Sequence, residues 1–258
     1  LPHKKGPEFT EFENNIFLVH APVPEKINNY LFALENTLPL FDWVWYNYVI
    51  NYVIKYEIEI LHAHDMYMAR PAKWAAGRLN IPLILDLHEN YPAAVKEYLW
   101  ANRFPSNLIV RPGKWKRKER KYLSYADRII VLSSSFRNQL LSEYPGLGSG
   151  RFEIYPNVPD LEKMLSYRIN DNILPLDGRK TVFYFGVVSK RRGILTALEA
   201  VEKVAANNPA IHLRLIGPVD KAEKDIFSKT FMNKTIRDHI TYYPWKDIGE
   251  FPSLATAS

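Results

Sequence analysis

The sequence contains no cysteine, which excludes disulfide bonds and thiolate metal sites. It also lacks an apolar run near the ~20 residues that a membrane-spanning helix requires. The nearest run, Phe41–Ile54, is interrupted by Asp42, Asn47 and Asn51. No secretory signal pattern stands at the start, and these absences together are typical of a cytoplasmic protein. Of the 258 residues, 47% are apolar and 24% are charged, which is typical of a globular protein with one large domain or two small ones.

Positive charge is concentrated in one stretch. The net charge is +6, and Arg111–Lys121 (RPGKWKRKERK) holds seven basic residues and one acidic residue, so the rest of the chain is close to neutral. A nucleic-acid-binding protein would have a broader basic surface, and we therefore exclude that class. Trp115 and Tyr122 stand among the cations and Trp100 lies upstream, a combination that suits an anionic membrane surface. The alternative is a basic helix face that only contacts solvent.

Strand-like and helix-like segments alternate along the chain, which predicts an α/β protein with parallel strands. The expected strands are Asn15–His20, Ile58–His64, Ile81–Leu87, Ile129–Leu132, Phe152–Tyr155, Thr181–Phe185, Ile211–Ile216 and Ile240–Tyr243. The expected helices include Glu25–Glu35, Phe41–Tyr56, Ala69–Leu79, Lys114–Tyr125 and a segment with apolar residues at Ile194, Leu198, Val201 and Ala205. The polar segment Asp160–Lys180 is interpreted as the crossing between two domains.

Polar residues and glycines gather at the carboxyl ends of the expected strands, where open parallel sheets bind their ligands. They are His62–Asp65, His88–Glu89, Ser133–Ser135, Asn157, Gly186–Gly193 and Gly217. Loops at strand ends are often polar without binding anything, but the set as a whole predicts a site.

The segment Gly186–Gly193 (GVVSKRRG) predicts a diphosphate cradle. Glycine allows a sharp turn and a close approach to a ligand, and the free N–H groups before the following helix attract an anion. Lys190, Arg191 and Arg192 would add full positive charges. The segment is neither a P-loop nor a G-x-G-x-x-G loop, and a solvated basic turn is the alternative.

Two histidines, His62 and His64, stand at i and i+2 on an expected strand and therefore share one face, as in some metal hydrolases. His88 is available as a third ligand, but the set looks incomplete, and we expect no metal. The plainer alternative is a core histidine followed by Asp65 as a helix cap.

His88 and Glu89 follow the strand Ile81–Leu87, where the chain runs out toward a site. A histidine in this position can hydrogen-bond a sugar hydroxyl or polarise a reacting group, and Glu89 can accept hydroxyl hydrogen bonds or orient His88. The alternative is a capping carboxylate beside a buried histidine.

Taken together, these segments resemble the retaining glycosyltransferases of family 4, which have the GT-B fold of two Rossmann-like domains. The resemblance covers roughly residues 55–220. It rests on the order and spacing of ILHAHDMYMARPAKWAAGRLNIPLILDLHENYP, ADRIIVLSSSFRNQL, EIYPNVPD, VFYFGVVSKRRGILTALEAV and LRLIGP. It implies an acceptor-side domain at residues 1–160, an interdomain segment at 161–180 and the start of a nucleotide-sugar-binding domain at 181–258.

The resemblance also implies roles for individual residues. His88 falls on the family's histidine beside the donor sugar, Gly186 on the first glycine of its phosphate loop and Arg192 on the loop lysine that contacts the diphosphate. Val187 stands where the family has an arginine, for which Lys190 or Arg191 would compensate, and Gly193 closes the loop. Asp65, Glu89 and Asn157 are further candidates for substrate binding.

The function implied is transfer of a sugar from a nucleotide-sugar to an acceptor, with retention and without a metal or further cofactor. A lipid-linked or polysaccharide acceptor, and a membrane contact through Arg111–Lys121, would fit. The family's first strand is not found before Asn15. Its E-x7-E glutamate pair is expected after Tyr243, but the sequence stops before reaching it. We therefore expect a chain that is truncated at both ends and of doubtful activity. The alternatives are a metal-dependent hydrolase built on His62, His64 and His88, and a non-catalytic nucleotide-binding fragment.

Overall fold

A computed structural model describes residues 9–13, 16–35, 38–97, 113–167, 179–220, 223–231, 236–244 and 248–256. The chain divides into two compact units, Leu1–Asn157 and Val158–Ser258. Trp100, Arg111 and most of the expected interdomain segment, residues 168–178, lie outside the described residues. Among the helices described, none has the length and apolar character needed to cross a bilayer.

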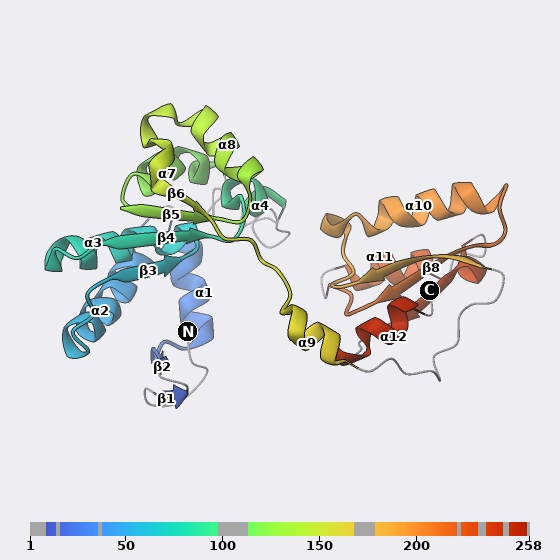
Figure 1. Ribbon diagram of the computed structural model, residues 1–258, viewed down its shortest axis with the longest axis horizontal. Coiled ribbons are helices and arrows are strands. Elements are labelled where there is room, and N and C mark those ends of the chain that lie inside the picture. Colours follow the sequence, from blue (N-terminus) through green and yellow to red (C-terminus); the bar gives the residue numbers. More distant parts are fainter. Residues whose placement is uncertain are drawn as a thin grey trace. The chain divides into compact units, whose positions relative to one another are not determined.

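The first unit is built on a four-stranded parallel sheet in the order β3-β4-β5-β6 (Figure 1). Its strands are β3 (Leu61–His64), β4 (Leu83–Leu87), β5 (Arg128–Val131) and β6 (Phe152–Ile154). The central strands bury their apolar residues, as expected for a parallel sheet that is covered on its faces. The alternation read from the sequence therefore predicted this sheet correctly, although its strands are slightly shorter than expected.

Helices of the first unit are α1 (Glu25–Leu34), α2 (Leu40–Lys55), α3 (Ala69–Leu79), α4 (Tyr91–Glu97), α7 (Lys114–Leu123) and α8 (Ser134–Glu143), with 3-10 turns at Met66–Met68, Pro145–Leu147 and Ser149–Arg151. Helix α3 packs on β3 and β4, α2 packs on α3, and α8 packs on β5 and β6. The Ser133 hydroxyl accepts a hydrogen bond from the Phe136 N–H at 3.1 Å and so caps α8.

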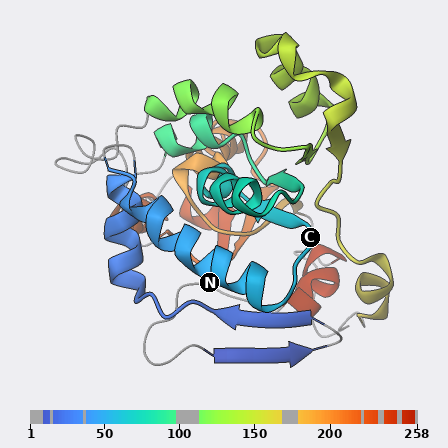
Figure 2. The same cartoon turned by 90° about the vertical axis from the view of Figure 1, so that its left-hand side faces the viewer.

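One expected strand lies elsewhere. Strand β2 (Ile16–His20) was expected among the strands of the parallel α/β architecture, but it pairs antiparallel with β1 (Phe9–Glu13) in a separate two-stranded sheet (Figure 2). Ile16 is 67% exposed. The apolar run NIFLVH was the reason for the expectation, and such a run does not show which partner a strand will pair with.

The second unit holds a three-stranded parallel sheet in the order β7-β8-β9, formed by Lys180–Phe185, Ile211–Ile216 and Ile240–Tyr243. Its helices are α9 (Leu161–Ser166), α10 (Ile194–Ala205), α11 (Lys224–Phe231) and α12 (Phe251–Thr256), with 3-10 turns at Lys190–Arg192, Arg237–His239 and Ile248–Glu250. Helix α10 buries Ile194, Leu198 and Val201, as the helical spacing predicts. On the face of the sheet opposite α10, Phe251 of α12 packs on Phe183 and Phe185 of β7.

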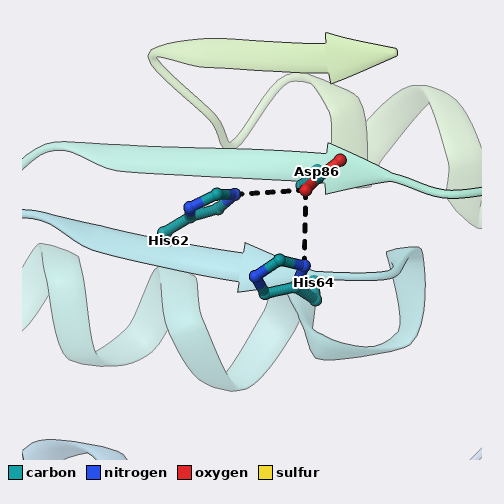
Figure 3. A group of neighbouring side chains, drawn as sticks. All are labelled: His62, His64 and Asp86. Carbon is teal, nitrogen blue, oxygen red and sulfur yellow. Dashed lines mark ion pairs between the residues drawn. The ribbon is translucent and has the colours of Figure 1, made fainter. Parts of the chain in front are cut away.

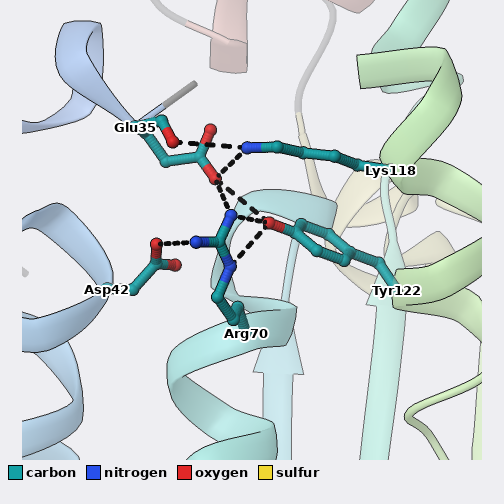
Figure 4. A network of polar contacts seen from close by, with 5 residues as sticks. All are labelled: Glu35, Asp42, Arg70, Lys118 and Tyr122. Carbon is teal, nitrogen blue, oxygen red and sulfur yellow. Dashed lines mark hydrogen bonds and ion pairs between the residues drawn. The ribbon is translucent and has the colours of Figure 1, made fainter. Parts of the chain in front are cut away.

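A buried charge network fixes the basic helix α7 to the first unit (Figure 4). The Glu35 carboxylate, fully buried, accepts from Lys118 Nζ at 2.7 Å, Tyr122 OH at 3.1 Å and Arg70 Nη2 at 3.2 Å. Arg70 Nη1 also lies 3.0 Å from Asp42 Oδ2. Burial raises the pKa of Asp42 to about 7, and burial lowers the pKa of Lys118. Part of the positive charge of α7 is therefore structural.

The aromatic residues of α7 do not face outward. Trp115 and Tyr122 are each only 1% exposed, so the expectation that they would contact a membrane interface is wrong. Lys116 forms ion pairs with Glu119 and Glu143. The cations of α7 that remain exposed are Arg117, Arg120 and Lys121.

Candidate active site

Three imidazoles converge on one carboxylate at the carboxyl ends of β3 and β4. His62 and His64 share one face of β3, and the register pairs His64 with Asp86 on β4. Asp86 Oδ2 lies 3.4 Å from His62 Nε2 and 3.3 Å from His64 Nδ1 (Figure 3). His88 Nε2 lies 3.4 Å from the same oxygen and 2.9 Å from His64 Nδ1. These four residues form the histidine–aspartate cluster.

The histidines of this cluster are accessible, while its carboxylate is buried. The side chains of His62 and His64 are 42% and 60% exposed, so the interpretation of a core histidine is wrong. Asp86 is only 7% exposed. Sequence reasoning missed Asp86, although an aspartate inside the apolar strand IPLILDL is itself a signal, because a buried carboxylate requires partners.

Asp65 does not cap the following turn, in contrast to the alternative considered from the sequence. Its carboxylate accepts a hydrogen bond from Tyr67 OH at 3.1 Å. Its backbone has φ 68° and ψ 149°, a conformation that residues other than glycine rarely adopt. Strained backbone of this kind is typical of residues held in place at functional sites.

Two hollows open beside the cluster, both within the first unit. The larger has a volume of about 710 Å³, and its lining includes His62, His64, Asp65, Glu89 and the aromatic residues Phe32, Phe41, Trp45, Tyr67 and Tyr91. The smaller, of about 370 Å³, is lined by His62, His64, Asp86, His88, Ile130, Leu132, Tyr155 and Asn157. The structure therefore brings the candidate residues of the first unit to two adjoining hollows that share His62 and His64.

The glycine loop of the second unit joins β7 to α10. Gly186 has φ 152° and Gly193 has φ 76°. Between them, Lys190, Arg191 and Arg192 form a 3-10 turn and are all exposed. Gly217 directly follows β8, and a Cβ built there would lie 2.0 Å from the Gly186 carbonyl oxygen. The two strand ends therefore approach so closely that only glycine fits at position 217.

Several N–H groups of the loop are already bonded inside the unit. The Lys190 N–H donates to Glu223 Oε2 at 2.7 Å, the Val188 N–H to the Pro218 carbonyl at 2.9 Å, and the Gly193 N–H to the Lys190 carbonyl at 2.9 Å. For these groups the prediction of free donors is wrong. Sequence reasoning missed Glu223, because a contact across 33 residues leaves no local signal. The loop's exposed cationic side chains are therefore its clearest means of binding an anion.

Residues 10–163, more than half of the chain, match the sequence profile of Glycosyltransferase Family 4. The chain belongs to this family. The match includes the histidine–aspartate cluster and both hollows. It does not favour the alternative of a metal-dependent hydrolase. No curated protein matches the chain.

Solved structures share the fold at low sequence identity. Sucrose-phosphate synthase from Thermosynechococcus elongatus is 20% identical with a TM-score of 0.64, and the match covers 99% of this chain and 61% of that one. The E. coli trehalose-6-phosphate protein bound with UDP-2-fluoro glucose is 14% identical with a TM-score of 0.68, covering 99% and 68%. Anabaena HepE in complex with UDP is 13% identical with a TM-score of 0.57, covering 86% and 56%.

These likenesses identify the α/β architecture as that of GT-B glycosyltransferases. The chain spans between 56% and 62% of the length of the first three structures that it matches. The family member described here thus contains a complete histidine–aspartate cluster in one unit and a cationic glycine loop in the other.

Proposed function

We propose that this family 4 protein transfers a sugar from a UDP-sugar to an acceptor, with retention of the anomeric configuration. The observation that carries the proposal is the family match over residues 10–163, a range that contains the convergence of His62, His64 and His88 on Asp86. The choice of UDP rests on the shared fold, because HepE was solved with UDP and the E. coli protein with UDP-2-fluoro glucose.

In this proposal the unit Val158–Ser258 binds the nucleotide-sugar. Arg192 and Lys190, with Arg191 beside them, hold the diphosphate and stabilise the negative charge that develops on it as the bond to the sugar breaks. Their exposure and their position on one short turn support this role. Gly186 and Gly193 shape the loop. Cationic side chains perform this work without a metal ion or a further cofactor.

His88 positions the donor sugar. Its ring is held from one side by Asp86 and by His64 Nδ1 at 2.9 Å, which leaves the other ring nitrogen to face a sugar hydroxyl. Holding a reacting group in one orientation lowers the entropy that must be lost on the way to the transition state. Asn157 lines the smaller hollow together with His88 and is a further candidate for contact with the sugar.

The larger hollow binds the acceptor in this proposal. Phe32, Trp45 and Tyr67 give it apolar walls, and Asp65 and Glu89 supply carboxylates that can accept from hydroxyl groups. Such a lining suits an acceptor that carries both hydroxyls and an apolar portion. A lipid-linked acceptor therefore fits better than a purely polar polysaccharide.

A peripheral contact with an anionic cytoplasmic membrane surface accompanies this choice of acceptor. Arg117, Arg120 and Lys121 on α7 are exposed and can attract anionic lipid. The patch is smaller than the sequence alone indicates, because Lys116 and Lys118 are already paired with carboxylates.

The test is turnover of UDP-sugars by the purified chain. We expect release of UDP that depends on the acceptor, and we expect His88→Ala to lower kcat more than it lowers the affinity for UDP, since His88 faces the sugar. An equal loss of UDP affinity would assign His88 a structural role. Binding of UDP without any turnover would favour the non-catalytic nucleotide-binding alternative, and failure to bind any UDP-sugar would refute the proposal.

A further inference from the structure

We propose that His62, His64 and Asp86 form a binding site for one divalent transition-metal ion of the zinc class. The two imidazole nitrogens and the carboxylate oxygen lie within 4.8 Å of one another (Figure 3). This site is separate from the diphosphate loop and does not depend on the proposed transfer reaction. The proposal assigns metal binding alone to this site and no hydrolytic activity.

The distances in the cluster match the spacing of metal ligands. Zinc binds nitrogen and oxygen at about 2.0–2.1 Å, and the corners of a tetrahedron with such bonds are about 3.3–3.4 Å apart. Asp86 Oδ2 lies 3.4 Å from His62 Nε2 and 3.3 Å from His64 Nδ1. Hydrogen bonds between nitrogen and oxygen are typically shorter, at about 2.9–3.0 Å. Two of the three edges therefore match those of a coordinated ion, and the third, between the His62 and His64 nitrogens, is within 4.8 Å, so rotation of the exposed rings can bring all three atoms to one ion.

The donor set selects the class of metal. Two imidazoles and one carboxylate are typical ligands of Zn²⁺ and related transition metals, whereas Mg²⁺ and Ca²⁺ prefer oxygen donors alone. The buried Asp86 carboxylate supplies negative charge at the base of the site. The exposed histidine rings and the hollow of about 370 Å³ in front of them give an ion a path from solvent.

The site is largely preformed by the sheet. His62 and His64 are two residues apart on β3 and so project from the same face, and the ladder pairs His64 directly with Asp86. Their rings are stacked, with centroids 4.5 Å apart and planes inclined by 22°. Binding therefore requires little ordering of the backbone.

His88 lies beside the proposed ligands. Its Nε2 lies 3.4 Å from Asp86 Oδ2 and 2.9 Å from His64 Nδ1, and the second distance is that of a hydrogen bond. A metal bound to His64 Nδ1 would replace this hydrogen bond, and water would take the fourth position of the ion, as in open zinc sites. If His88 also positions the donor sugar, a claim that rests on the proposed function, then a bound metal removes one of the contacts that hold its ring.

The test is metal binding by the full chain after removal of bound metals with a chelator. Titration with Co²⁺, followed by the visible absorption bands of tetrahedral cobalt, should show one equivalent bound and displaced by Zn²⁺. We expect His64→Gln and Asp86→Asn to weaken binding by at least about 100-fold, the upper end of what loss of even an outer-shell partner costs. The matched control is His239→Gln, which removes an imidazole from the second unit.

The outcomes separate clearly. Tight binding by the unmodified chain and by His239→Gln, with loss in both cluster variants, supports the site. Absence of cobalt bands and of retained zinc in the folded, unmodified chain overturns it, as does equal binding by His64→Gln. Because the His64 side chain is 60% exposed, its replacement leaves the core intact and remains decisive even if Asp86→Asn does not fold.

Discussion

The two units differ in the residues that follow the carboxyl ends of their parallel strands. The first unit presents imidazoles and carboxylates, with His62, His64 and His88 around Asp86. The second presents glycines at Gly186 and Gly217, followed by exposed cations. The side chains of the first can therefore accept from hydroxyl groups or bind a metal, whereas the second offers exposed cations to a negatively charged group. Two parallel sheets of one chain thus carry different chemistry at their strand ends.

The units also differ in how they bury charge. The first unit places Glu35, Asp42, Arg70 and Lys118 in one connected network. The second holds His212, which is 1% exposed, between Arg179 Nη1 at 2.8 Å and the Thr241 hydroxyl at 2.8 Å. Burial, with Arg179 nearby, lowers the pKa of His212 to about 4. We therefore expect the stabilities of the two regions to change with pH in opposite directions.

The largest expected effect concerns the second unit alone. Gly217→Ala would place a Cβ 2.0 Å from the Gly186 carbonyl oxygen at a φ of +137°. We expect a loss of stability on the order of 4 kcal/mol or more, because neither backbone can yield without breaking the sheet. Urea unfolding of the variant, together with hydrogen exchange of the β8 amides, measures this loss of stability.

Gly193→Ala is the matched control for that change. Its φ is +76° but no atom lies within 4 Å of the added Cβ, so only backbone strain of about 1 kcal/mol is expected. Equal losses for the two variants would contradict the close approach of the strand ends.

The second prediction sharpens the comparison of buried charge. Asp42 has a folded pKa of about 7, above its unfolded value, so its contribution to stability is complete below about pH 4 and is lost as pH rises toward 7. His212 has a folded pKa of about 4, below its unfolded value, so its contribution is complete above about pH 6.5 and is lost as pH falls toward 4. As the pH rises from about 4 to 7, the amide protection measured by hydrogen exchange should fall in the first unit and rise in the second.

Asp42→Asn tests the origin of the trend in the first unit. This variant should flatten the pH dependence of β4 and β5 and leave that of β8 unchanged. The rise of the Asp42 pKa to about 7 corresponds to a change in the free energy of unfolding of roughly 4 kcal/mol as an upper bound. An unchanged slope in β4 would mean that Asp42 is ionised in the folded protein throughout the range.

The third prediction concerns the cationic loop. Arg192→Ala should weaken UDP binding by about 1.5–3 kcal/mol, the scale of a hydrogen bond to a charged group. Calorimetry measures it, with Lys203→Ala as control, because Lys203 is an exposed cation in the last turn of α10 rather than in the loop. If both variants bind UDP as the unmodified chain does, Arg192 is not a phosphate ligand.

The effect that is smallest for each residue changed concerns the surface of α7. Changing Arg117, Arg120 and Lys121 to Glu should reduce co-sedimentation with anionic vesicles at low salt, since each cation near such a surface contributes about 1 kcal/mol. Lys203→Glu is the control for overall charge. If the unmodified chain stays in the supernatant under these conditions, the membrane contact is refuted.

Local patterns were sufficient for most of the fold. Apolar runs and helical spacing predicted the strands β3 to β9 and the helices α1, α2, α3 and α7, because these elements follow from residues near in sequence. The pairing of β1 with β2 was not predicted, since pairing partners are a tertiary property. Glu223 was missed for the same reason, because it acts through a residue on another element. Asp86 had a local signal, a carboxylate inside the apolar strand IPLILDL, but its partners are on another strand.

The basic helix shows the limit of composition as a guide. Its charges and aromatic residues were visible in the sequence, but the burial of Trp115 and the pairing of Lys118 with Glu35 depend on a contact across 83 residues. A periodic pattern identifies the helix and its two faces. It does not show which charges will find a buried partner.

The network around Glu35 has a consequence for the order of folding. Tyr122 bonds to Glu35 across 87 residues, and Arg70 stands between them. Until α7 arrives, the acidic groups near the start of the chain are left with an incomplete set of partners, which makes early burial of α1 and α2 unfavourable. The set of partners around Glu35 is therefore complete only after residue 122 has been synthesised, which favours closure of this part of the core late in synthesis.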